Sequence, residues 1–208
     1  MSPTNTRTTG RPTAAAAVLA LSLAAGLLPA VAGAVTPGEP APDFTLTDTE
    51  GQTHALAALL EEGRIVVLEW FNPECPFILK HHQHHRTMED LAARYRDQGV
   101  VWLAINSGAP GKQGAGLERN KKAREDFRME IPVLLDEDGA VGNAFGAKTT
   151  PHMFVIGRDG KIAYAGAIDD DRSPGTLGKV NHVGATLDAL LAGKAVPVAE
   201  SQPYGCSV

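Results

Sequence analysis

Two periodicities of apolar positions alternate along most of the chain. Short runs that are almost wholly apolar, or in which apolar and polar residues alternate, are typical of strands in a covered sheet. Stretches with apolar residues three or four positions apart are typical of helices that cover such a sheet. The first pattern predicts strands at 44–47, 65–69, 100–105, 131–135, 153–156 and 162–165. The second pattern predicts helices at 55–60, 76–98, 117–128, 140–145 and 183–192.

The order of these elements predicts the fold class. Strands and helices alternate as far as residue 145, which favours parallel neighbours in one sheet. The tight turn at 158–161 then joins the last two strands as a hairpin, which adds antiparallel neighbours. The sequence therefore predicts an α/β protein with a mixed central sheet, flanked by helices on both faces. A strand or hairpin extension at 44–51 precedes the alternating part.

The first 34 residues differ in composition from the rest of the chain. Their only charged side chains are Arg7 and Arg11, and a run of mostly Ala, Leu and Val covers 14–32. A basic start, an apolar middle and small residues at the end are typical of a secretory signal peptide. We expect cleavage after Ala34, with Ala32 as the second choice, and a single periplasmic or secreted domain at 35–208. The alternative is an uncleaved anchor, because the apolar run is just long enough to span a bilayer.

Charge and cysteine content limit the partners of the exported domain. Without the two leader arginines, 17 Lys and Arg residues face 24 Asp and Glu residues, a net charge of −7. This balance argues against nucleic acid or an anionic membrane surface as a partner, so neither is expected after cleavage. The three aspartates at 169–171 are expected in a solvated loop. The only cysteines, Cys75 and Cys206, form either a structural link or a working redox couple, because exported cysteines usually pair and this size needs no disulfide.

Cys75 lies where a predicted core strand passes into a predicted helix. Pro76 follows it and suits the first helical position, where its missing N–H costs nothing. A thiol at the start of a helix lies at the positive end of the helix dipole, which favours the reactive thiolate. Glu74 opposes this, since a nearby carboxylate disfavours a second negative charge. We expect Cys75 to attack a hydroperoxide or a disulfide; the alternative is a small buried core residue.

A second thiol is needed to complete such a cycle, because the attack leaves a sulfenic acid or a mixed disulfide on sulfur. Cys206 is the only candidate in the chain, and the mobility expected of the tail at 196–208 would let it reach Cys75. We therefore expect Cys206 to resolve the intermediate; a static disulfide and a dispensable cysteine are the alternatives. An external thiol reductant would close the cycle. No organic cofactor is expected, since sulfur carries the electrons.

Several segments resemble the thioredoxin-fold redoxins, the superfamily of peroxiredoxins and exported thiol–disulfide oxidoreductases. The similar segments are 38–46, 66–80 around the cysteine, 150–156, 166–170 and 205–208. Their combination is similar to a peroxiredoxin-like subgroup of alkyl hydroperoxide reductases and thiol-specific antioxidants. The resemblance implies a thioredoxin-like fold for nearly all of the mature chain, and an antioxidant activity. It also implies that Pro151 is cis and faces the thiol, where it and the extended Thr150 would shape a substrate groove.

The chain departs from both family patterns near the thiol. Thioredoxins carry a second cysteine three positions on, where this chain has Ile78. Peroxiredoxins carry a proline and a hydroxyl residue at the positions of Leu68 and Asn72, so the usual peroxide-binding hydroxyl is missing. The amide of Asn72 is expected to donate in its place. Trp70 and Phe71 are expected to form a hydrophobic rim around the thiol, with plain core as the alternative. Peroxide and protein disulfide both remain open as substrates.

The chain also has a histidine cluster, formed by His81, His82, His84 and His85. On a helix His81 and His85 lie one turn apart, a spacing that can chelate Zn²⁺ or Cu²⁺. Phased on the apolar stripe, His84 faces the core and His82 points away, so the four cannot meet at one ion. We expect no metal site and a solvated Lys80. The rival functions are a metal-handling protein that uses these histidines and a non-catalytic binding module with a structural disulfide.

Overall fold

The computed structural model describes residues 1–6 and 35–208. The predicted signal peptide therefore lies outside the described residues, apart from its first six positions. Among the helices that are described, none has the length and apolar character needed to cross a membrane.

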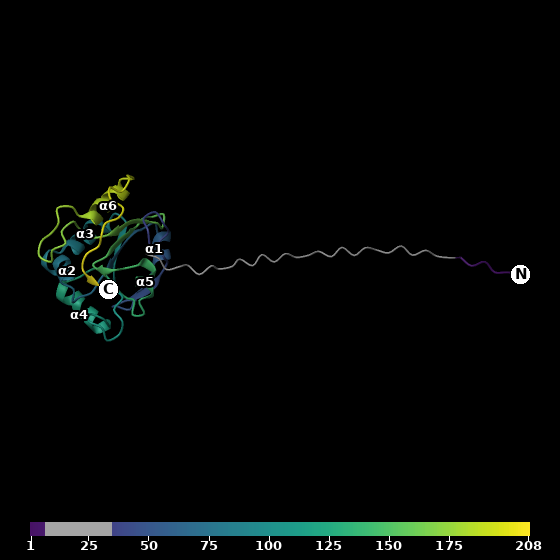
Figure 1. Cartoon of the computed structure of the whole chain (residues 1–208), viewed down its shortest axis with the longest axis horizontal. Helices are drawn as coiled ribbons and strands as arrows, with labels where there is room; N and C mark the ends of the chain where they lie inside the picture. Colours follow the sequence, from purple (N-terminus) through teal and green to yellow (C-terminus); the bar gives the residue numbers. More distant parts are fainter. Residues whose placement is uncertain (7–34) are drawn as a thin grey trace. The chain divides into compact units, whose positions relative to one another are not determined.

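A seven-stranded mixed sheet forms the centre of residues 35–208 (Figure 1). In spatial order its strands are β2 (Thr53–Ala55), β1 (Thr45–Asp48), β5 (Val133–Leu135), β4 (Val100–Asn106), β3 (Ile65–Trp70), β7 (Met153–Ile156) and β8 (Ile162–Gly166). The three central strands β5, β4 and β3 are parallel, and every other pairing is antiparallel. The predicted mixed sheet is confirmed, and β1 with β2 forms the N-terminal hairpin.

Helices cover both faces of this sheet (Figure 1). The first core cluster contains side chains of α2 (Pro76–Leu79), α3 (Thr87–Arg96), α4 (Leu117–Phe127) and α6 (His182–Leu191). The second core cluster contains side chains of α1 (Leu56–Glu61) and α5 (Ala140–Phe145). Successive side chains of a strand point to opposite faces, so Val67 joins the first cluster and Val66 and Leu68 join the second. The predicted α/β class with two helical layers is confirmed.

The single helix predicted at 76–98 is interrupted. α2 passes directly into a π-helical turn, η1 (Lys80–His84), which closes with a hydrogen bond from the His85 N–H to the Lys80 carbonyl at 3.0 Å. Arg86 then adopts a left-handed φ of 53° before α3 begins. A π turn holds more residues than an α turn, so it shifts the phase of the side chains that follow.

This shift overturns three predictions about the histidine segment. His84 is exposed, whereas His82 and Lys80 are fully buried. The prediction that His84 faces the core, that His82 points away and that Lys80 is solvated is therefore wrong. An uninterrupted period of 3.6 residues therefore assigns the wrong faces within the π turn, although Met88 and Tyr95 beyond it are buried as the apolar stripe predicted.

The C-terminal tail is docked along β8, the strand at one edge of the seven-stranded sheet. Ser201 donates its N–H to the Ala165 carbonyl in β8 at 3.1 Å, and Ala165 donates to the Ala199 carbonyl at 3.0 Å. Further along, the tail forms β9 (Cys206–Ser207), which pairs antiparallel with β6 (Thr149–Thr150). The tail, which was expected to be mobile, is docked in this structure, where backbone hydrogen bonds hold it at two places.

Candidate active site

Cys75 caps the N-terminus of α2 and is 2% exposed. β3 ends at Trp70, and a turn follows in which the Cys75 N–H donates to the Asn72 carbonyl at 3.0 Å. Cys75 itself has extended backbone angles, φ −78° and ψ 124°, and the helix begins at Pro76. The sulfur therefore lies at the junction of a central strand and a helix, where the sequence pattern placed it.

The Thr150–Pro151 peptide bond is cis and its loop lies against the sulfur. The Cys75 thiol donates to the Thr150 carbonyl, with 2.8 Å between Sγ and O. Thr150 is buried, and within the described part of the chain its hydroxyl has no partner other than the nearby Cys75 sulfur, whose thiolate form it favours. Thr150 and Pro151 thus adjoin the thiol, as the family resemblance implied.

Cys206 lies directly opposite Thr150 in the β6–β9 pairing. Both its thiol and its backbone N–H lie near enough to the Cys75 sulfur to lower the pKa of that thiol. Both cysteines are free thiols in this arrangement. Two cysteines that are far apart in the sequence are therefore brought together by the docked tail, which creates a dithiol without a C-x-x-C motif.

The two thiols differ in acidity. Burial raises the pKa of Cys75, but hydrogen bonds with Cys206, the Thr150 side chain and the Ile78 N–H outweigh it, so that this pKa is lowered overall. Burial and the neighbouring Cys75 raise the pKa of Cys206 to about 11. Cys75 is therefore the sulfur that ionises first, and Cys206 remains its protonated donor. Because the thiolate is the nucleophilic form, this difference assigns attack to Cys75.

Glu74, which was expected to oppose ionisation of the Cys75 thiol, extends its side chain to Arg119 in α4. Its carboxylate accepts a hydrogen bond from the Arg119 guanidinium in α4 at 2.5 Å. The guanidinium offsets the negative charge next to the thiol. The Ile78 N–H belongs to the first turn of α2, so the helix start contributes to the lowered pKa of Cys75 as predicted.

Replacing Thr150 by valine is expected to raise the pKa of Cys75. Valine keeps the β-branched shape but removes the hydroxyl that stabilises the thiolate. The hydroxyl has no other partner among residues 35–208, so we expect folding stability to change by less than about 1 kcal/mol. The ultraviolet absorbance of the thiolate, followed against pH, measures the shift. An unchanged midpoint would remove Thr150 from the site, and Thr149→Val is the matched control.

Asn72 and Trp70 do not meet the thiol as expected. The Asn72 side chain accepts the Glu74 N–H at 2.9 Å and donates to the Gln113 carbonyl at 3.2 Å, so its amide holds the glycine-rich loop at 107–116. Trp70 is fully buried in the second core cluster, whereas Cys75 belongs to the first. The hydrophobic rim predicted at Trp70 is therefore wrong, and the plain-core alternative is right, because side chains alternate along β3.

A buried charged network lies in the first core cluster, and the sequence pattern did not reveal it. Glu69 accepts from His82 Nε2 at 2.7 Å and from Trp102 Nε1 at 3.1 Å. His82 Nδ1 lies 3.2 Å from the Glu89 carboxylate. Burial lowers the pKa of His82, but the two carboxylates raise it to about 9, so the imidazole is charged at neutral pH. A lone acidic residue inside an apolar strand was the available signal, because such a group needs a partner.

A second buried network holds the tail near the active site. The Tyr204 hydroxyl donates to the Asp169 carboxylate. It also accepts from Lys80 Nζ at 3.4 Å and from His81 Nε2 at 3.0 Å. Lys80 in addition donates to the Asp171 carbonyl at 2.8 Å. The expectation that 169–171 is merely a solvated loop is therefore wrong for Asp169, which is 3% exposed.

The histidines do not converge on one point. His81 contacts Tyr204, His82 lies between two carboxylates, and His84 and His85 are exposed. Across residues 1–6 and 35–208 there is no group of three His, Cys, Asp or Glu side chains arranged to hold a metal ion. The geometry gives the metal-handling alternative no support.

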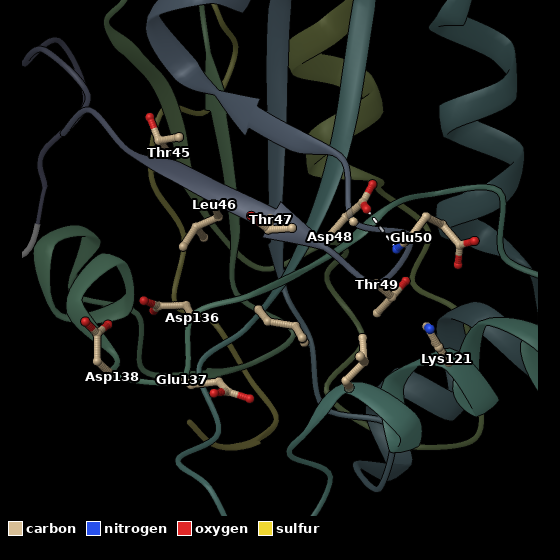
Figure 2. A pocket seen from close by; sticks show the side chains of 13 residues that line it. Thr45, Leu46, Thr47, Asp48, Thr49, Glu50, Lys121, Asp136, Glu137 and Asp138 are labelled. Atoms are coloured by element: carbon tan, nitrogen blue, oxygen red, sulfur yellow. Dashed lines mark hydrogen bonds between the residues drawn. The ribbon is translucent and has the colours of Figure 1, made fainter.

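A cleft of about 780 Å³ lies away from the two cysteines (Figure 2). Its walls come from β1, the turn after β5 and the start of α4, and they carry acidic side chains around Lys121. Neither cysteine lines this cleft. The candidate active site is therefore the covered dithiol at the cis-proline loop and not this hollow.

Comparisons with known proteins agree with this fold. Residues 36–183 match the family model described as Redoxin. The thiol-disulfide oxidoreductase ResA of Geobacillus thermodenitrificans is 33% identical over 129 residues, which cover 62% of this chain and 68% of the relative.

Two solved structures have the same fold over most of their length. A hypothetical protein from Sinorhizobium meliloti has a TM-score of 0.74 and 29% identity, and covers 85% of this chain and 95% of its own. An uncharacterized conserved protein from Geobacillus kaustophilus has a TM-score of 0.74 and 33% identity, with coverages of 83% and 90%. The family match and the mixed sheet flanked by helices lead to one conclusion: this chain belongs to the redoxin family and has a thioredoxin-like fold.

Proposed function

We propose that this redoxin is a thiol–disulfide oxidoreductase whose redox couple is Cys75 and Cys206 of one chain. The observation that carries the proposal is the docking of Cys206 against a Cys75 thiol of lowered pKa, beside a cis-proline loop. The relatives named thiol-disulfide oxidoreductase ResA support the reaction class.

In the first step the Cys75 thiolate attacks one sulfur of a substrate disulfide. A bond forms between Cys75 and that sulfur, the substrate S–S bond breaks, and the second substrate sulfur leaves as a thiolate. The hydrogen bonds that lower the pKa of Cys75 increase the fraction of this sulfur that is present as the attacking thiolate. The product is a mixed disulfide on Cys75.

In the second step Cys206 loses its proton and attacks the Cys75 sulfur of the mixed disulfide. The remaining substrate sulfur leaves as a thiolate, and the Cys75–Cys206 disulfide forms; two electrons have passed to the substrate. Part of the raised pKa of Cys206 comes from Cys75. That part disappears once Cys75 is bonded, so Cys206 becomes easier to ionise when it is needed. An external thiol reductant then restores both thiols.

Equimolar reaction with 5,5′-dithiobis(2-nitrobenzoate) tests the couple. We expect two equivalents of released thionitrobenzoate in two phases, the second independent of protein concentration. Cys206→Ser is expected to stop after one equivalent, with the other half of the reagent on Cys75. Release of one equivalent by the unaltered protein, or of two by Cys206→Ser, would refute the proposed couple.

Hydroperoxides, the other substrate class expected from the sequence, fit this site less well. The Asn72 amide, the expected peroxide donor, is engaged with the Gln113 carbonyl and the Glu74 N–H. Cys75 is covered by the tail, with a second thiol already in place. We therefore place disulfides first as substrates, and antioxidant activity forms no part of the proposal.

We also infer that the oxidoreductase domain is exported and acts in the periplasm or outside the cell. The basic and apolar composition of 1–34 supports removal of this leader and a mature chain of 35–208. Sequencing the N-terminus of the exported protein checks the inference: Val35 is expected first, and a retained leader would contradict it.

A further inference from the structure

We propose that Tyr204 is a positioning residue that holds Cys206 beside Cys75, on the edge of β6 where an extended substrate would otherwise pair. Tyr204 thereby speeds the attack of Cys206 on the mixed disulfide and slows the attack of Cys75 on outside disulfides. The inference rests on the proposed Cys75–Cys206 couple. It adds that docking of the tail controls the rates of both chemical steps, which does not follow from the couple alone.

The tail approaches the cis-proline loop as closely as a backbone can. Cys206 pairs with Thr150, and the preceding Gly205 has a φ of +143°, a conformation that other residues rarely adopt. A Cβ atom on Gly205 would collide with the Thr150 carbonyl. Glycine is therefore required at 205, where β9 reaches the thiol. Because glycine has no side chain to hold the tail, neighbouring side chains must set its direction.

Tyr204 supplies that fixation, because its side chain is held on every side. It is 4% exposed, and its ring centroid lies 5.5 Å from that of Phe77. Its hydroxyl donates to Asp169 and accepts from His81. Burial, opposed by Asp169 and reinforced by Lys80, lowers the pKa of His81 to about 3, so its ring is neutral. Because the Tyr204 hydroxyl already donates its proton to Asp169, it accepts from His81 Nε2.

The same chain segment that presents Cys75 also holds Tyr204. Phe77 lies in α2, and Lys80 and His81 follow in η1, whose π turn places both side chains in the interior. Lys80 Nζ lies 5.2 Å from the centre of the Tyr204 ring. The attacking sulfur and the side chains that anchor the tail therefore lie on one continuous helical segment, so the docked tail brings Cys206 to Cys75.

Docking of the tail has opposite consequences for the two chemical steps. An outside disulfide must reach Cys75, which is 2% exposed, and an extended substrate would pair with the edge of β6 that β9 now occupies. Attack therefore requires the tail to leave. Resolution requires it to return, and a tail held in one geometry gives Cys206 a high effective concentration at the mixed disulfide.

Stopped-flow reaction of the full chain with 5,5′-dithiobis(2-nitrobenzoate) separates the two steps. Measured at a pH where Cys75 is fully ionised, Tyr204→Ala is expected to accelerate the first phase and to slow the second by roughly tenfold or more. Tyr204→Phe keeps the ring and loses the hydroxyl bonds, so about a fivefold change in each direction is expected. Tyr95→Phe is the matched control. It removes another buried hydroxyl, which bonds to Asp188 at 2.7 Å, and it should leave both phases unchanged.

Each outcome decides between the two proposals. One equivalent released by the unaltered protein would remove the redox couple, and this inference with it. Two equivalents with unchanged phases in the Tyr204 variants would leave the couple intact and overturn the role of Tyr204. Slowing of both phases, or equal effects in Tyr95→Phe, would identify a general loss of stability and overturn it as well. Should Tyr204→Ala fail to fold, Tyr204→Phe decides.

Discussion

Cys75→Ser is expected to reduce disulfide exchange to the background rate. The hydrogen bonds around this position lower the pKa of a thiol, but a serine hydroxyl in the same place stays protonated at neutral pH and does not attack a disulfide. Oxygen for sulfur is a small change in volume, so the fold should be retained. Steady-state reduction of a disulfide substrate, with an external dithiol present, measures the loss.

The control for Cys75→Ser is the other cysteine. Cys206→Ser should still undergo the first step and accumulate a mixed disulfide, because Cys75 keeps its helix N–H and the Thr150 hydroxyl. The two variants therefore differ in kind: one does not react, and the other reacts once. Turnover that survives in Cys75→Ser would show that another group carries the chemistry.

Glu69→Gln is expected to cause the largest loss of folding stability. Glu69 is fully buried, and its carboxylate is the nearest partner of the charged His82 imidazole. Removing one partner of a buried ion pair costs about 3–5 kcal/mol. The Glu89 carboxylate stays 3.2 Å from His82 Nδ1 and compensates part of the charge, so we expect a loss near the lower end of this range. Urea denaturation measures the difference. Glu130→Gln is the matched control, since this exposed carboxylate pairs with Arg96 at the surface and should change stability little.

The same network predicts how stability depends on pH. The pKa of His82 is about 9 in the folded protein, above the value near 6.5 expected in the unfolded chain. Its contribution is therefore complete below about pH 6.5 and is lost as the pH rises through about 9, a change on the order of 3 kcal/mol. Measuring it in the Cys75→Ser background removes the opposing titration of that thiol. A flat profile between these values would contradict a charged His82.

The fold and the position of the thiol follow from local patterns in the sequence. Apolar runs and helical periods each depend on a few neighbouring residues, so the central strands, α4 and α5 are predicted close to their observed bounds. The Cys75–Pro76 junction and the cis Pro151 are likewise local features, readable from the change of period and from the family resemblance. Such features do not depend on contacts between distant segments.

The parts that were not predicted depend on long-range contacts or on one unpatterned turn. The π turn before α3 changes which residues are buried, and the spacing of apolar residues does not predict such a turn. The place of Tyr204 depends on Asp169 and His81, which lie in separate segments. Trp70 is a different case. Counting alternate positions along β3 places Trp70 on the same face as Leu68, in the second core cluster, whereas Cys75 belongs to the first.

Peptide mapping of the oxidised protein tests the central claim most directly. Reduced protein is treated with a limiting disulfide substrate, free thiols are alkylated under denaturing conditions, and the digest is analysed by mass spectrometry. The account predicts one cross-linked peptide pair that joins Cys75 to Cys206 within a monomer. An alkylated Cys206 together with a Cys75 that carries the substrate, or a cross-link only between two chains, would contradict it.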